Sequence, residues 1–369
     1  MFAYATSTPT ARQMVADVTV VGTGIIALTS AIELADRGLS VRLVGTMHSG
    51  NASSAAGGML APSVGRKSGS VQAFAEASRD SYPDFVTELS ERSGRHIPLN
   101  VDGIFEVALT ESDFGMLERS FESPSRWVSP AELASEEPAL TPGFGAVYHP
   151  LDGCVEPLRL LDALSVVVAG HNSITTVRED CRELHATELG CNILTAMESR
   201  FASDYVVLAA GAWTPLIAGS GQIAENVKPV RGQMIALEGA PIRHVTCGAG
   251  GYLIPRSDGV TVVGGTMENA GFEAVTTPAG LEMIQSRAAA LCPALDSAAA
   301  HSSWAGLRPV TPDLLPIIGA DPARPRVIYA CGHSRNGILL APLTAEAIGD
   351  IVCGTAPRHD LSRFRPGRH

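Results

Sequence analysis

The order of apolar and polar positions predicts a strand, a helix and a second strand near the start of this 369-residue chain. Residues 18–21 form an apolar, β-branched run that suits a buried parallel strand. Apolar positions between Ile26 and Leu34 follow helical spacing up to Gly38, and residues 39–44 predict the second strand. Together these segments predict a βαβ unit.

Similar patterns divide the rest of the chain into helical segments and β-rich blocks. Helices are predicted at 70–94, 111–123, 131–138, 158–169, 278–290 and 338–352. Strands are predicted at 101–109, 145–150, 204–213, 232–237, 251–255, 260–264, 315–319 and 327–330, with a small meander over 173–200. Two β-rich blocks therefore interrupt a nucleotide-binding region that is discontinuous in sequence.

We expect a mixed α/β fold with two domains. A Rossmann-like domain would take residues 17–84, 151–225 and 301–356, and a β-rich antiparallel domain would take residues 85–150 and 226–300. Residues 1–16 lack a hydrophobic segment of signal-peptide length and predict a disordered tail. Residues 357–369 predict a C-terminal tail.

Composition excludes several classes of function. The formal net charge of −11 argues against nucleic acid or anionic lipid as a partner, because both favour a basic surface. The sequence has no run of 18 apolar residues, so we predict no membrane span. The seven cysteines are scattered without a C-x-x-C pair. This predicts free thiols in a reducing cytoplasm, and neither a disulfide framework nor a metal site.

Gly22, Gly24 and Ala27 form a G-x-G-x-x-A pattern at the turn between the first strand and the first helix. The first glycine permits the tight turn, the second lets a diphosphate approach the backbone, and Ala27 allows close packing of helix and strand. The helix N-terminus offers N–H groups and the positive end of its dipole to the diphosphate. Glycines also mark ordinary turns, but the place of this pattern between a strand and a helix favours dinucleotide binding.

A loop rich in Gly, Ala and Ser at 51–62 has few side chains that could pack. It is either a flexible linker or a loop that lies flat against a large ligand, with Ser53 and Ser54 as hydrogen-bond donors. The apolar end of the loop favours the second interpretation. Two later strands, at 204–213 and 327–330, also end at glycine turns where a backbone can approach a ligand.

Several segments, in order from about residue 18 to about residue 352, resemble the FAD-dependent D-amino acid oxidase superfamily, and within it the glycine oxidase branch. They are VVGTGIIALTSAIELADRG, SSAAGGMLAP, VVLAAGAW, PVRGQMIAL, YLIPRSDG, VVGGTM, WAGLRPVTPDLLPIIG and CGHSRNGILLAPLTAEAI. The sequence GLRP followed by TPD, and the sequence H-x-RNGILLAP, are the most specific to this branch. The resemblance implies a glutathione-reductase-type fold that binds FAD.

The resemblance implies three groups of FAD contacts. The first turn would hold the diphosphate, the small-residue loop would line the diphosphate and the isoalloxazine ring, and the backbone near Arg182 would meet the adenine. The implied cofactor residues are Gly22, Gly24, Ile25, Ile26, Gly45, Thr46, Ala52, Ser53, Ser54, Gly57, Gly58, Met59, Arg182, Gly211, Trp213, Gly332, His333, Arg335, Asn336, Gly337 and Ile338.

The resemblance also implies four residues at the substrate. Arg308 and Arg335 match the family's two substrate-contacting arginines, and Tyr252 matches the tyrosine that shares the substrate carboxylate. Met267 matches an apolar wall of the pocket. Each has an ordinary structural interpretation as well. Arg308 could form a surface ion pair, Arg335 could serve the flavin or the turn, and Tyr252 could be a strand aromatic. Met267 could pack in the core.

Two positions, Gly45 and Gly250, depart from the family pattern, and a comparison at about Gly306 concerns how flavin is attached. The second strand ends at Gly45, where relatives carry an acid that accepts from the ribose hydroxyls of the adenosine. An acid placed there is expected to tighten FAD binding, unless Thr46 or His48 already fills the role. Gly250 stands where glycine oxidases can carry a histidine, which predicts a wider or less polar pocket. Gly306 stands where sarcosine-oxidase-like relatives attach flavin through cysteine, which predicts non-covalent FAD.

The implied reaction is oxidation of a small amino acid or amine, of the glycine, sarcosine or D-amino acid type, by hydride transfer to flavin N5. The products would be an imine or 2-oxo acid and hydrogen peroxide, with molecular oxygen as acceptor and a homo-oligomer as one possible assembly. One alternative is a dehydrogenase of a 2-hydroxy acid or amino acid that uses another acceptor. Others are a tailoring oxidase of a larger amine and a flavin-free binding protein.

Overall fold

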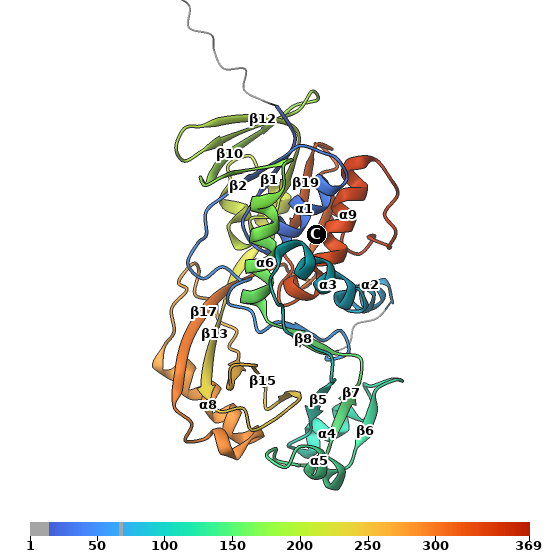
Figure 1. Cartoon of the computed structure of the whole chain (residues 1–369), viewed down its shortest axis with the longest axis vertical. Coiled ribbons are helices and arrows are strands. Elements are labelled where there is room, and N and C mark those ends of the chain that lie inside the picture. The colour runs from blue at the N-terminus through green and yellow to red at the C-terminus, as the bar shows by residue number, and fades with distance from the viewer. Residues whose placement is uncertain (1–14, 66–68) are drawn as a thin grey trace, which may run out of the picture.

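The computed structural model describes residues 15–65 and 69–369. Figure 1 shows one part in which helices surround a sheet and, below it, a part built mainly from strands. Most of the predicted N-terminal tail lies outside the described residues. Ala16, which that prediction included, starts the first strand and pairs with Ser203, so the predicted tail extends one residue too far.

The first sheet is mixed. Its strands are β1 (Ala16–Val21), β2 (Val41–Val44), β9 (Ile174–Val177), β10 (Cys181–Ala186), β11 (Cys191–Thr195), β12 (Arg200–Leu208), β18 (Ile317–Ala320) and β19 (Val327–Cys331). The parallel strands β9, β2, β1, β12 and β19 have the order of a dinucleotide-binding fold, with β18 antiparallel to β19 at that edge. β1 lies between β2 and β12, and β9 follows β2 at one edge. β19 pairs with the second half of β12, whereas β10 and β11 extend its first half as an antiparallel meander.

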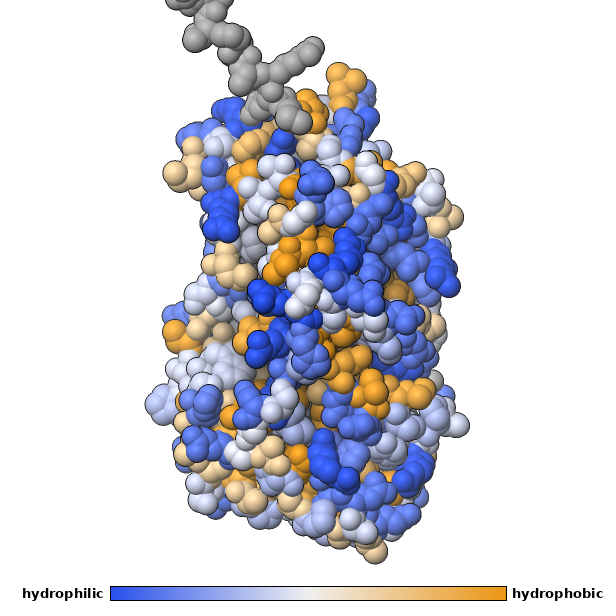
Figure 2. Space-filling view, viewed as in Figure 1, coloured by the Kyte–Doolittle hydropathy of each residue, from blue (hydrophilic) through white to orange (hydrophobic). Residues whose placement is uncertain are grey.

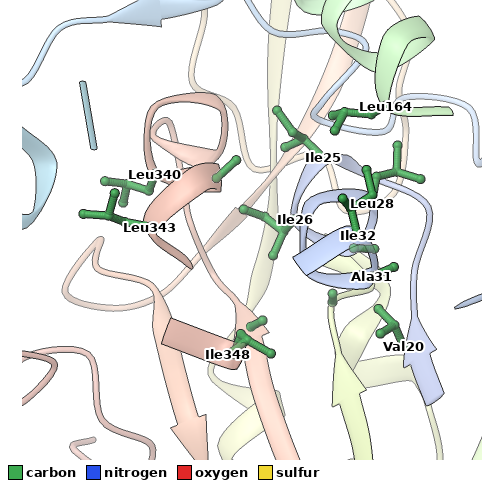
Figure 3. Packing of buried hydrophobic residues seen from close by; sticks show 14 of the residues in the cluster. Val20, Ile25, Ile26, Leu28, Ala31, Ile32, Leu164, Leu340, Leu343 and Ile348 are labelled. Atoms are coloured by element: carbon green, nitrogen blue, oxygen red, sulfur yellow. The ribbon is translucent and has the colours of Figure 1, made fainter. Parts of the chain in front are cut away.

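Helix α1 lies at the centre of the core of this part. α1 (Ile25–Asp36) packs against α9 (Gly337–Cys353) and against α6 (Pro157–Gly170), and it is buried on nearly every side. Figure 3 shows its side chains between Leu340 and Leu343 of α9 and Leu164 of α6. This burial fixes the start of α1 at the end of β1, where the glycine turn lies.

The second sheet joins the two predicted β-rich blocks. In spatial order its strands are β17 (Ala300–Val310), β13 (Lys228–Glu238), β16 (Val260–Gly264), β15 (Gly251–Pro255), β14 (Val245–Gly248), β5 (Ile104–Val107), β7 (Ala146–His149) and β6 (Arg126–Val128). Adjacent strands in this sheet are antiparallel, except for β14 and β5, which are parallel. The two sheets confirm the predicted mixed α/β fold with a Rossmann-like part and a β-rich antiparallel part.

Shorter elements complete the chain. Helix α8 packs on the second sheet, and a three-stranded sheet has the order β3, β8, β4. Their bounds, with those of the remaining helices, are α4 (Glu111–Leu117), α5 (Pro130–Glu136), α7 (Gln222–Glu225), α8 (Pro278–Leu291), β3 (Met59–Leu60), β4 (Leu99–Asn100) and β8 (Gly153–Val155).

Two boundaries between the Rossmann-like part and the β-rich part differ from the predicted ones, at residues 82–93 and at β17. The predicted helix 70–94 is two helices, α2 (Gly69–Asp80) and α3 (Tyr82–Ser93), because Pro83 in the first turn of α3 cannot continue a helix from α2. α3 packs against α6, so it belongs with the nucleotide-binding sheet. β17 lies in the second sheet, because nearly its whole length pairs with β13.

The C-terminal segment 357–369 is packed and is no free tail. Phe364 is 1% exposed, its ring centroid lies 5.0 Å from that of Phe74, and its carbonyl accepts from Ile318 N–H at 2.9 Å. Figure 2 shows polar residues over most of the viewed face, with apolar residues in small groups. In the described part of the chain, no helix has the length and apolar character needed to cross a bilayer.

Candidate active site

A cavity of about 1060 Å³ is lined by residues of both large sheets. This volume exceeds the range of roughly 300–1,000 Å³ that is usual for small-molecule sites, so the cavity has room for a dinucleotide. One end lies where β1 and β2 finish, and Gly22 and Gly45 line it there. The other end lies at β13, β15 and β17, and Tyr252 and Arg308 line it there.

The turn after β1 forms the first end. Gly22 has a φ of +135°, and a Cβ there would lie 2.3 Å from the carbonyl oxygen of Ala209, so only glycine fits. α1 begins after Gly24, which gives no side-chain cap, and Ile25 N–H donates to Ser53 Oγ at 3.0 Å. The start of α1 lines the cavity, so its N–H groups and its dipole suit a diphosphate.

The small-residue loop after β2 is held against β17. Asn51 forms a β-bridge with Leu307, and Trp304 Nε1 donates to Ala55 O at 3.1 Å. A Cβ at Gly306 would lie 2.4 Å from the Cβ of Ala55. No side chain fits at position 306 in this arrangement, so a cysteine could not attach a cofactor there. The loop is therefore a fixed wall of the cavity and not a flexible linker.

Arg308 projects from β17 over β13. A Cβ at Gly232 would lie 2.0 to 2.4 Å from the guanidinium atoms, so the guanidinium lies directly over this glycine. Arg308 Nη1 donates to Thr266 O at 2.8 Å. The side chain is half-buried, and no carboxylate of the described residues forms an ion pair with it. A planar, partly desolvated guanidinium without an acidic partner is a binding site for a carboxylate.

Tyr252 lies close to Arg308. A Cβ at Gly264 would lie 2.4 Å from the Tyr252 hydroxyl oxygen, and a Cβ at Gly57 would lie 3.1 Å from its ring. Two glycines thus make room for this ring. Burial raises the pKa of the Tyr252 phenol, although the positive charges of Arg308 and Arg335 act in the opposite direction. The phenol is therefore protonated at neutral pH and can donate a hydrogen bond.

The turn before α9 brings Arg335 to the same end of the cavity. Ser334 N–H donates to Pro309 O at 2.9 Å, which fastens the turn to β17. Arg335 is exposed and lines the cavity, whereas His333 is buried, with Nε2 3.1 Å from Thr344 Oγ1. Burial lowers the pKa of His333 to about 3, so its ring is neutral.

Comparison with known proteins identifies the family. Residues 17–351 match the DAO family of FAD-dependent oxidoreductases. The chain belongs to this family. It is 32% identical to glycine oxidase from Geobacillus kaustophilus, with 96% of the chain and 97% of that protein covered. The match to the crystal structure of that enzyme has a TM-score of 0.91 and covers 96% of this chain and 99% of the crystallised chain.

Relatives in other bacteria match over different lengths. Glycine oxidase from Pseudomonas putida is 32% identical, with 95% of the chain and 98% of that protein covered. The bifunctional protein ThiO/ThiG from Synechocystis is 33% identical over 96% of the chain. The chain spans only 54% of that protein's length.

FAD is the cofactor of this oxidoreductase family, and the cavity fits it. Gly22 leaves space that a side chain would fill, and the uncapped start of α1 would hold the diphosphate. At the other end, Gly337 and Ile338 at the start of α9 line the cavity, and Asn336 gives no side-chain cap. The N–H groups of α9 would therefore stabilise negative charge on the reduced flavin.

The FAD cavity gathers most of the predicted site residues. All four predicted substrate residues line it, and Met267 is 56% exposed, which excludes the core-packing interpretation. Ser54 and Gly332 do not line it: Ser54 Oγ donates to Asn51 O at 3.3 Å, and Gly332 faces Thr311. The predicted cofactor residues that do line it are Gly22, Gly24, Ile25, Ile26, Gly45, Thr46, Ala52, Ser53, Gly57, Gly58, Met59, Arg182, Gly211, Trp213, His333, Arg335, Asn336, Gly337 and Ile338.

Some polar residues of the cavity are not marked by any sequence motif. Glu268 accepts from Arg231 Nη2 at 2.5 Å and from Gln233 Nε2 at 2.7 Å, so its charge is already paired. Arg287 of α8 lies 3.7 Å from where a Cβ at Gly250 would be. The space beside Gly250 therefore faces a guanidinium, which makes this part of the cavity polar. Asp180 also lines the cavity, at its nucleotide end.

Proposed function

We propose that the chain is an oxidase of a small amino acid, of the glycine, sarcosine or D-amino acid type, with molecular oxygen as acceptor. The observation that carries this proposal is the half-buried guanidinium of Arg308 at the far end of the FAD cavity, which has no acidic partner among residues 15–65 and 69–369. The full-length similarity to glycine oxidases supports it. When bound, FAD would accept a hydride from the amine-bearing carbon and pass the two electrons to oxygen. The products would be an imine and hydrogen peroxide.

The protein's own residues bind and orient the substrate. Arg308 Nη1 donates to Thr266 O, and the guanidinium also forms a hydrogen bond with the Tyr252 hydroxyl. The remaining N–H groups would bind a substrate carboxylate. The Tyr252 phenol holds its proton and donates it to Met234 Sδ at 3.2 Å, a weak acceptor. In the complex Tyr252 would donate to the substrate carboxylate instead. Two attachment points fix the position of the α-carbon, which lowers the entropic part of the barrier.

No side chain is required as a general base in this scheme. His333, which could otherwise accept a proton, is buried against Thr344 and does not point its Nε2 into open space. The substrate amine must therefore react in its neutral form, with its own lone pair assisting departure of the hydride. The imine would leave the site and hydrolyse in water to the 2-oxo acid.

A peroxide-coupled screen tests the proposal. The holoenzyme is incubated in air with glycine, sarcosine, D-amino acids and amines of similar size without a carboxylate. We expect peroxide from the amino acids and far less from the amines. Turnover that occurs only with an artificial electron acceptor would instead identify a dehydrogenase, and preference for a larger amine would identify a tailoring oxidase.

A further inference from the structure

The nucleotide end of the FAD cavity contains an acid, but not on the strand where the fold usually places it. β2 ends at Val44, directly before Gly45. The neighbouring strand β9 ends at Val177, whose carbonyl accepts from Gly45 N–H at 3.1 Å. The loop after β9 brings Asp180 to the cavity, which Thr46 and His48 also line. The carboxylate therefore reaches this region from the adjacent strand.

Asp180 is held by the residues that follow β2. Its Oδ1 accepts from Thr46 N–H at 3.2 Å and from Thr46 Oγ1 at 2.6 Å, and His48 Nε2 lies 3.2 Å from the same oxygen. Thr23 Oγ1 donates to Thr46 O at 2.9 Å, which ties this arrangement to the first turn. The Asp180 side chain is 42% exposed, and Oδ2 accepts no hydrogen bond from the described residues. One oxygen is fixed and the other is open to a ligand.

We propose that Asp180 accepts the hydrogen bonds of the adenosine ribose hydroxyls of FAD, in place of the acid that β2 lacks. A dinucleotide-binding fold places this ribose beside the end of the second strand. Thr46 directly follows Gly45, so its two hydrogen bonds hold the Asp180 carboxylate at that position. A carboxylate suits the role, because a charge-assisted hydrogen bond is about twice as strong as one between neutral groups.

The geometry at Gly45 leaves little room for an acidic side chain directly after β2. Gly45 has a φ of +157°, and a Cβ there would lie 3.1 Å from Thr23 Cγ2 and 3.3 Å from the carbonyl carbon of Gly22. A glutamate at position 45 would press on the first turn and place a second negative charge near Asp180. Gly45→Glu should therefore weaken FAD binding, which reverses the expectation from sequence.

The test measures affinity for two cofactors. Full-length apoprotein, prepared by removing FAD from the holoenzyme, is titrated by flavin fluorescence with FAD and with an analogue whose adenosine ribose lacks both hydroxyls. Asp180→Asn removes the charge and keeps the size of the side chain. Glu179→Gln is the matched control, because Glu179 is the adjacent acid but accepts from Thr195 Oγ1 at 2.5 Å and does not line the cavity.

We expect Asp180→Asn to weaken binding of FAD by roughly tenfold or more, because hydrogen bonds to a charged acceptor are lost. Its affinity for the analogue should match that of the wild type within about twofold, since the analogue cannot make those bonds. Glu179→Gln should bind both cofactors like the wild type. An equal loss for both cofactors in Asp180→Asn, or no loss for FAD, would overturn the proposal. These readouts do not depend on turnover, so they are independent of the substrate assignment.

Discussion

At the scale of single residues, the proposed choice of substrate rests on Arg308. A carboxylate buried beside the flavin cannot go unpaired. The guanidinium fork matches two carboxylate oxygens, whereas lysine offers only a point charge. Arg308 is already oriented by Thr266 and by the absence of a side chain at Gly232, so little ordering remains when the substrate binds.

Replacement of Arg308 tests this directly. We expect Arg308→Ala to reduce kcat/KM for an amino acid by roughly two orders of magnitude or more, because a buried ion pair is broken. Arg308→Lys should recover part of the loss, and a carboxylate-free amine should be nearly indifferent to both changes. Steady-state peroxide assays measure the effect, and the flavin absorbance spectrum is the control. Loss of bound flavin in Arg308→Ala would show a structural role instead.

Gly232 gives a second test of the same geometry. In Gly232→Ala the new methyl group would occupy the place of the Arg308 guanidinium, which is the movable end of a flexible side chain. We therefore expect kcat/KM to fall by roughly tenfold or more while the melting temperature changes little. Gly170→Ala is the matched control, because a Cβ at Gly170 would meet open space. Equal activity in the two variants would contradict the placement of Arg308.

Sequence motifs predict residues such as Arg308 and Tyr252 because each lies in a short segment characteristic of the family. Asp180 and Arg287 have no such signal. Asp180 contacts Thr46, which lies in the loop after a different strand, and Arg287 faces Gly250 only because α8 packs on the second sheet. Contacts between distant segments depend on strand order and helix packing, which local patterns do not contain.

At the scale of elements, periodicity predicts most helices and strands but not which sheet a strand joins. β17 was expected with the nucleotide-binding part because the segments after it return there. β17 belongs to the second sheet instead, because nearly all of its 11 residues pair with β13. The apolar spacing continues across residues 70–94 and therefore predicts a single helix. The structure divides this segment because Pro83, in the first turn of α3, interrupts the backbone hydrogen bonds.

The packed C-terminal segment leads to a prediction on stability. Phe364 is almost completely buried against Phe74, next to the helices that carry the cofactor-binding turns. We expect Phe364→Ala to lower the free energy of unfolding by about 3–5 kcal/mol, since the large cavity it leaves cannot be refilled. Urea unfolding followed by circular dichroism measures this. A change below about 1 kcal/mol would show that the segment is not part of the cooperative core.

At the scale of the whole molecule, low pH lowers the free energy of unfolding by protonating carboxylates that pair with arginine side chains. Burial alone would raise the pKa of Asp313, but hydrogen bonds from Arg368 and from Leu315 N–H bring it down to about 2. The folded pKa thus lies below the ordinary value of 3.8. The stabilisation is therefore fully present above that value and is lost as the pH falls toward 2.

This linkage can be measured by unfolding at several pH values. Between ~pH 4 and ~pH 2 the free energy of unfolding of the wild type should fall more steeply than that of Asp313→Asn. Above ~pH 5 the variant should be the less stable of the two by a constant amount. Urea midpoints across this range measure both proteins. Parallel profiles would show that Asp313 keeps the same proton affinity when the chain unfolds.

The attachment of the small-residue loop to β17 limits how this enzyme can change in evolution. Asn51 bridges to Leu307, and the next residue of the strand is Arg308. One strand therefore positions both the small-residue wall of the cavity and the proposed carboxylate anchor. An insertion or deletion of one residue in β17 would turn Arg308 to the opposite face of the sheet. Gly250 and Met267 line the same cavity but lie outside β17, so changes at those positions would reshape the pocket without shifting the register of Arg308.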